Sequence, residues 1–85
     1  MTERELELLG LEKQEMVEYE GEENPDYYYA IKLVTGLDFI TNTKSESKDG
    51  DWYVEFFDTD PYVRFYKFGE VQALFNQITR NIVKK

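Results

Sequence analysis

Short stretches with apolar side chains at every second position fill the middle of the chain, and they constrain its fold more than any other feature. Five of them occur, at about residues 15–20, 27–34, 37–43, 52–57 and 62–66. Successive side chains of a β-strand point to opposite faces, so each stretch predicts a strand. Turn signals separate them, namely Asn24-Pro25, Thr35-Gly36, Asp49-Gly50 and residues 58–61. The short connections predict antiparallel strands that pair in chain order.

Helical patterns stand at both ends of this region. Residues 2–9 begin with Thr2-Glu3-Arg4-Glu5, the spacing of a capping box, and Gly10 suits the left-handed residue that follows a helix. A longer helix is predicted over about residues 68–83. Its apolar stripe has helical spacing and consists of Val71, Leu74, Phe75, Ile78 and Ile82.

The element order predicts an α+β fold in one domain, residues 1–85. It has a short N-terminal helix, a five-stranded antiparallel meander sheet and a C-terminal amphipathic helix packed on one sheet face. The apolar face beneath the helix is expected to include Ile31, Leu33, Trp52, Val54, Phe56, Val63 and Phe65. The opposite face is expected to carry Tyr28, Tyr53, Phe57, Tyr62 and Tyr66, mixed with Lys32, Glu55 and Arg64.

The composition argues against catalysis. The chain has no Cys and no His, so thiol and imidazole chemistry and thiolate zinc sites are excluded. Neither a phosphate-binding lysine loop nor a dinucleotide glycine motif occurs. Asp49 with Asp51, and Asp58 with Asp60, are better explained as turn residues than as calcium ligands. We therefore predict a protein that is not an enzyme and needs no cofactor and no metal.

The negative charge is concentrated in the first third of the chain. Residues 1–26 contain ten acidic and two basic residues, which accounts for the whole net charge of −8. This sign disfavours direct binding to nucleic acid. One interpretation is a solvated face that keeps the protein soluble. The other is an acidic surface for a partner with a basic surface, with Glu18, Glu20, Glu22 and Glu23 at its centre. If Glu15–Glu20 form a strand, alternate glutamates would lie on one side of it.

Aromatic residues make up 16% of the chain, more than one apolar sheet face needs. On the second face they could be purely structural, because cross-strand aromatic pairs stabilise a sheet. They could also form a binding surface, since tyrosine and arginine are enriched at interface hot spots. The candidate contact residues on this face are Tyr28, Tyr53, Phe57, Tyr62 and Arg64.

Several segments give the chain a resemblance to small acidic proteins encoded by phages and prophages. They are Leu8-Leu9-Gly10-Leu11-Glu12-Lys13, Tyr27-Tyr28-Tyr29, Asp51-Trp52-Tyr53-Val54-Glu55-Phe56-Phe57 and Val71-Gln72-Ala73-Leu74. Proteins of this kind include inhibitors of bacterial defence systems, some of which present acidic surfaces in place of nucleic acid. The resemblance implies such a role and assigns no site residue.

Two function hypotheses follow. The first is a non-enzymatic interaction protein, an inhibitor of a host enzyme that binds nucleic acid or acts in defence, working through its acidic surface. The alternative is a structural or assembly protein that forms a homodimer through the tyrosine-rich sheet face. We expect no membrane contact, because no apolar run approaches the length of a span. The expected location is the cytoplasm of a bacterial host.

Overall fold

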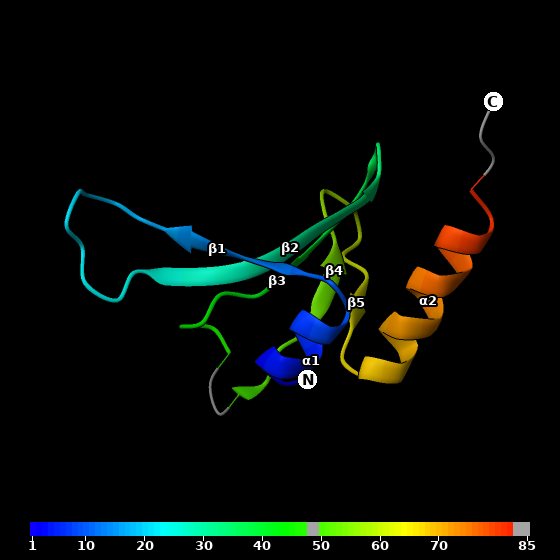
Figure 1. The fold of residues 1–85 in the computed structure, drawn as a ribbon, viewed down its shortest axis with the longest axis horizontal. Coiled ribbons are helices and arrows are strands. Elements are labelled where there is room, and N and C mark those ends of the chain that lie inside the picture. Colours follow the sequence, from blue (N-terminus) through cyan, green and yellow to red (C-terminus); the bar gives the residue numbers. More distant parts are fainter. Residues whose placement is uncertain (48–49, 83–85) are drawn as a thin grey trace.

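A computed structural model of the chain describes residues 1–47 and 50–82. It confirms the predicted α+β fold, with one five-stranded antiparallel sheet between two helices in chain order (Figure 1). The elements are α1 (Glu3–Leu8), β1 (Glu12–Met16), β2 (Asp26–Val34), β3 (Leu37–Thr41), β4 (Val54–Phe56), β5 (Arg64–Phe65) and α2 (Phe68–Arg80).

The sheet is a meander, as predicted. Its strand order is β1-β2-β3-β4-β5, and each strand pairs antiparallel with its neighbours in the chain. The register places Ile31 opposite Phe39 and Phe39 opposite Phe56, so three apolar side chains cross the middle of one face. Gly36, at a φ of +89°, allows the tight turn between β2 and β3.

Helix α1 begins and ends as its sequence predicts. The Glu5 backbone N–H donates to Thr2 Oγ1 at 3.2 Å, and the Thr2 backbone N–H donates to Glu5 Oε1 at 2.9 Å, which completes the capping box. Gly10 follows the helix at a φ of +96°. The Leu11 N–H then donates back to the Leu6 carbonyl at 3.1 Å. The side chains of Leu6 and Leu11 are both buried. The turn therefore leads the chain into β1 and adds apolar burial at the end of the helix.

The core lies between the helices and one face of the sheet. The buried apolar side chains come from both helices, the turn after α1, the strands and the segment before β4: Leu6, Leu11, Tyr29, Phe39, Trp52, Val54, Val71 and Phe75. Helix α2 reaches the sheet through Phe75, whose ring centroid lies 4.9 Å from that of Phe39. Ile78 is only partly buried but packs against this core. The predicted apolar stripe is therefore the face by which α2 binds the sheet.

Some predicted boundaries differ from the structure. The first strand spans Glu12–Met16, so the expectation of a strand over residues 15–20 is wrong for most of its length. Helix α2 ends at Arg80, and Ile82 beyond it is 39% exposed; Val83 lies outside the described residues. Val63, expected in the core, is 41% exposed because it precedes the two-residue strand β5.

A single carboxylate fastens α1 to the sheet. Oε1 of Glu3 accepts hydrogen bonds from the hydroxyls of Tyr27, at 2.7 Å, and Tyr29, at 3.0 Å. The bond to Glu3, with burial and nearby negative charge, raises the pKa of Tyr27 to about 12. Burial, followed by the bond to Glu3, raises the pKa of Tyr29 as well. The folded chain thus holds both phenols in their neutral form.

This arrangement predicts a loss of stability in alkaline solution. Because the folded pKa values lie above the ordinary value of 10, the stabilisation is complete below about pH 10 and is lost as the pH rises towards 12. Urea unfolding at a series of pH values should show the midpoint falling in that window. The control is Glu3→Gln, which removes the negative charge; its midpoint should fall less steeply. Parallel slopes for the two proteins would contradict this role of Glu3.

Candidate protein-interaction surface

The sheet face opposite the helices is uncovered and forms two open hollows. The first, of about 520 Å³, lies over β1, β2 and β3 and is lined by side chains that include Glu12, Gln14, Lys32 and Asp38. The second, of about 340 Å³, lies mainly over β3, β4 and β5 and also contacts Met16 of β1 and Tyr28 of β2. Ile40 and Phe57 line both hollows, so the two are adjacent. We call the second one the tyrosine hollow.

The tyrosine hollow collects the aromatic residues that the sequence singled out. Tyr28, Tyr53, Phe57, Tyr62 and Arg64 all line it. They come from β2, β5 and the segments that flank β4. Phe57 and Tyr62 are 57% and 70% exposed, so they present large apolar surfaces to solvent. The alternation of the strands thus brings together five contact candidates that are up to 36 positions apart in the chain.

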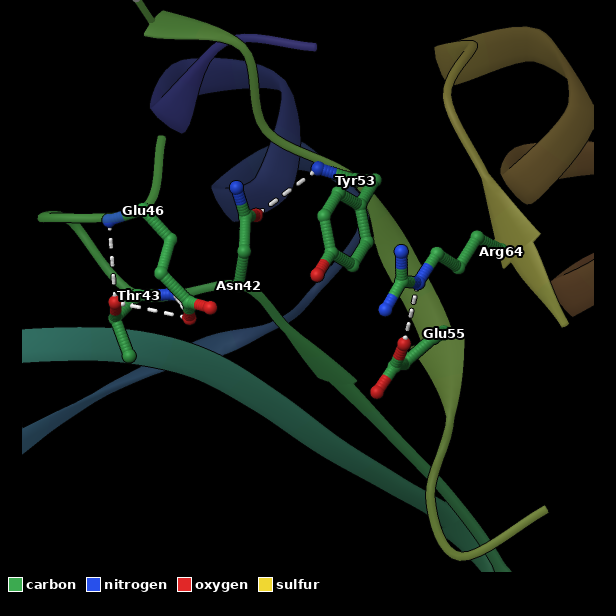
Figure 2. Close-up of polar contacts among 6 residues, drawn as sticks. All are labelled: Asn42, Thr43, Glu46, Tyr53, Glu55 and Arg64. Carbon is green, nitrogen blue, oxygen red and sulfur yellow. Dashed lines mark hydrogen bonds and ion pairs between the residues drawn. The ribbon is translucent and has the colours of Figure 1, made fainter. Parts of the chain in front are cut away.

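Arg64 contacts a carboxylate and two tyrosine rings of this hollow. Its Nε donates to Glu55 Oε2 at 2.9 Å, across the pairing of β4 with β5 (Figure 2). The guanidinium carbon lies 4.6 Å from the ring centroid of Tyr53 and 5.3 Å from that of Tyr62. The hydrogen bond that Arg64 donates to the Glu55 carboxylate raises the pKa of Arg64 further above its usual value. The charge is fixed between two tyrosine rings, the arrangement that favours cation–π attraction.

Asn42 fixes the position of Tyr53 through the backbone. The Tyr53 N–H donates to Asn42 Oδ1 at 3.1 Å (Figure 2). Asn42 Nδ2 donates in turn to the Asp51 carbonyl at 3.2 Å. Asn42 is 4% exposed, so these bonds satisfy a buried amide. Burial is the main cause of the raised pKa of Tyr53. Asn42 therefore fixes the backbone that carries the Tyr53 ring.

Glu46 stands at the edge of the same hollow and was not among the predicted residues. Its Oε1 accepts from the backbone N–H and the hydroxyl of Thr43, both at 3.0 Å (Figure 2). The Glu46 N–H donates back to Thr43 Oγ1 at 3.3 Å. This reciprocal pair is the capping-box pattern, and the spacing Thr43-x-x-Glu46 was a sequence signal that could have revealed it. Met16 and Ile40, which also line the hollow, had no such signal.

The four predicted glutamates lie elsewhere. Glu18, Glu20, Glu22 and Glu23 belong to residues 17–25, which connect β1 to β2 and extend beyond the sheet at one end of the molecule (Figure 1). We call this connection the acidic tip. The expectation that alternate glutamates share one side of a strand is wrong. The turn instead folds on itself, since the Glu18 N–H donates to Glu22 Oε2 at 2.9 Å. Three of the four side chains remain exposed, and Glu22 is half-buried.

The nine predicted contact residues thus form two groups, one in the tyrosine hollow and one on the acidic tip. Within residues 1–47 and 50–82, no group of three or more His, Cys, Asp and Glu side chains is arranged to hold a metal ion. Neither described helix is long and apolar enough to cross a membrane. Comparison with known proteins gives no matching family model, curated protein or solved structure.

Proposed function

We propose that this chain is a non-enzymatic interaction module that binds a protein partner through the uncovered face of its sheet. The observation that carries the proposal is the ordered cluster of Tyr53, Tyr62 and Arg64 in an open hollow. Tyrosine and arginine are the residue types that most often supply binding energy at protein interfaces. Side chains that are already held in position lose less conformational entropy on binding.

The size of the face is adequate for this role. A standard interface buries about 800 Å² on each partner, which is roughly one eighth of the 6361 Å² surface of this chain. The two hollows and their exposed rims, Met16, Phe57 and Tyr62, extend over all five strands. A partner could therefore reach this area without any change in the sheet.

The acidic tip supports a more specific form of the proposal. Its exposed glutamates would attract a partner with a basic surface and speed the encounter. An enzyme that binds nucleic acid has such a surface, so the proposal extends to an inhibitor of a host enzyme of that class. In this form the tip governs association, while the tyrosine hollow governs how long the complex lasts.

Site-specific photocrosslinking tests the location of the interface. A photoreactive phenylalanine analogue placed at Phe57 or Tyr62, in cells that naturally produce the chain, should capture a partner protein. The matched controls are Gln72 and Thr79, which are exposed on α2, and these should capture none. Equal capture at face and helix positions would contradict the proposal. Capture of a second copy of the chain, with a dimer in sedimentation that Tyr62→Ala dissociates, would assign the face to self-association.

A variant with an uncharged acidic tip should associate with the partner more slowly. Replacing Glu18, Glu20, Glu22 and Glu23 together with Gln should reduce the association rate by about tenfold and flatten its dependence on salt. The melting temperature should stay the same or rise, because mutual repulsion is relieved. Surface plasmon resonance with the captured partner, at about 50 mM and 300 mM salt, measures both effects.

The control variant makes the same change in charge at exposed acids outside the tip. It replaces Glu7, Glu15, Asp51 and Glu70 with the corresponding amides. If both quadruple variants slow association equally, net charge alone acts and the tip has no special role. If the tip variant binds like the original chain at both salt concentrations, the tip only maintains solubility.

A further inference from the structure

The tyrosine hollow already contains one guanidinium group. Arg64 lies within 5.3 Å of the ring centroids of both Tyr53 and Tyr62, and its charge is balanced by Glu55 at 2.9 Å. The hollow therefore shows, within the chain itself, how its aromatic rings and carboxylates accommodate an arginine side chain. Only one side of the hollow, over β4 and β5, is used in this way.

The other side of the hollow carries a second carboxylate, Glu46. No basic side chain among residues 1–47 and 50–82 forms an ion pair with it. Its hydrogen bonds to Thr43 hold the carboxylate group at the rim, and Figure 2 shows it across Asn42 from Tyr53. Glu46 is also one of the negative charges that, after burial, raise the pKa of Tyr53. The described lining thus has two carboxylates and one cation, in a chain of net charge −8.

We propose that the tyrosine hollow takes up an arginine side chain of the protein partner, which packs against Tyr28 and Tyr53 and pairs with Glu46. This inference rests on the proposed function and names the chemistry of the partner. Arginine suits the site better than lysine, because its planar group can lie against an aromatic ring while donating two hydrogen bonds to a carboxylate. The local excess of one negative charge favours a cationic occupant over an apolar one.

A peptide titration followed by NMR tests the proposal on the intact chain. The probe is a blocked Gly-Ser-Arg-Ser-Gly peptide, compared with versions in which lysine or citrulline replaces the arginine. Citrulline keeps the shape of arginine but has no charge. The arginine peptide should shift the amide signals of Thr43 and Tyr53 and the Nε–H signal of Arg64. The lysine peptide should bind more weakly, and the citrulline peptide should cause little shift.

Glu46→Gln is the decisive variant, because glutamine can still accept the hydrogen bonds from Thr43. This substitution should reduce the affinity for the arginine peptide by about fivefold, the size expected for one exposed ion pair. Glu70→Gln, which neutralises an exposed acid on α2, should leave the affinity unchanged. Shifts that map to residues 17–25, or equal binding of the arginine and citrulline peptides, would overturn the proposal. If the peptide experiment fails in this way but a partner is still captured at Phe57 and Tyr62, the arginine site is wrong and the proposed function still holds.

Discussion

Replacing Trp52 with alanine should remove a large part of the free energy that stabilises the fold. Trp52 is 1% exposed, and its ring contacts those of Tyr27 and Tyr29 at centroid distances of 6.0 and 5.5 Å. Truncating a buried tryptophan costs about 3–5 kcal/mol, out of the roughly 5–10 kcal/mol that a domain of this size has. The backbone of Trp52 also exchanges hydrogen bonds with Met1, at 3.1 and 3.2 Å; alanine keeps both bonds, so the substitution tests the ring.

Thermal unfolding followed by far-ultraviolet circular dichroism measures this effect. The melting temperature should fall by about 15 °C or more, since 1 kcal/mol corresponds to about 4–8 °C in a small domain. Leu8→Ala is the control, because Leu8 is apolar but 62% exposed, and it should melt close to the original chain. A Trp52→Ala protein that melts within a few degrees of the original would show that the ring is not the centre of the core.

The second large effect concerns binding. Tyr53→Ala should make the complex with the captured partner dissociate about thirtyfold faster, the loss expected at a hot spot of about 2 kcal/mol. The fold should survive, because the bond from the Tyr53 N–H to Asn42 belongs to the backbone and remains. The same change would remove one of the two rings that flank Arg64. Association should hardly change, which distinguishes this variant from the charge-neutral tip.

Tyr66→Ala is the matched control for Tyr53→Ala. The two rings are neighbours, with centroids 5.7 Å apart, yet Tyr66 is 53% exposed and does not line the hollow. It should change the dissociation rate by less than about threefold, since most interface-rim residues contribute little. Equal effects of the two substitutions would place the interface outside the hollow.

The predictable part of the fold is the part with strong periodicity. The odd-numbered residues of Tyr27–Val34 are all apolar or aromatic, and their side chains do face the core. Val71 and Phe75 repeat at helical spacing, and both are buried. Strand β1 lacks this periodicity. All five of its residues are exposed, so its sequence has no buried apolar face to repeat. It is a strand because β2 offers it an edge to pair with, so tertiary pairing outweighs its own preference.

The candidate site was predictable in part, for the same reason. Alternation placed Tyr28, Tyr53 and Arg64 on one face, and the structure brings them to one hollow. Residues 42–51 read as a polar loop, yet Asn42 and Ser47 are buried there. Polar side chains become buried when they form hydrogen bonds with backbone groups of distant segments. The pattern of polar and apolar residues along the sequence does not show which distant group a polar side chain will bind. The bond that Asn42 donates to the Asp51 carbonyl and the bond that it accepts from the Tyr53 N–H are of this kind.

The projection of the β1–β2 connection beyond the sheet has a consequence for how the protein can evolve. None of residues 17–25 belongs to the buried core, so their number and charge can change with little cost to folding. A longer tip would extend the reach of the charge, and a tip of opposite sign would favour a different class of partner, while the sheet behind it stayed intact. Natural selection could thus alter the charge that the acidic tip presents to solvent without disturbing the aromatic face of the sheet.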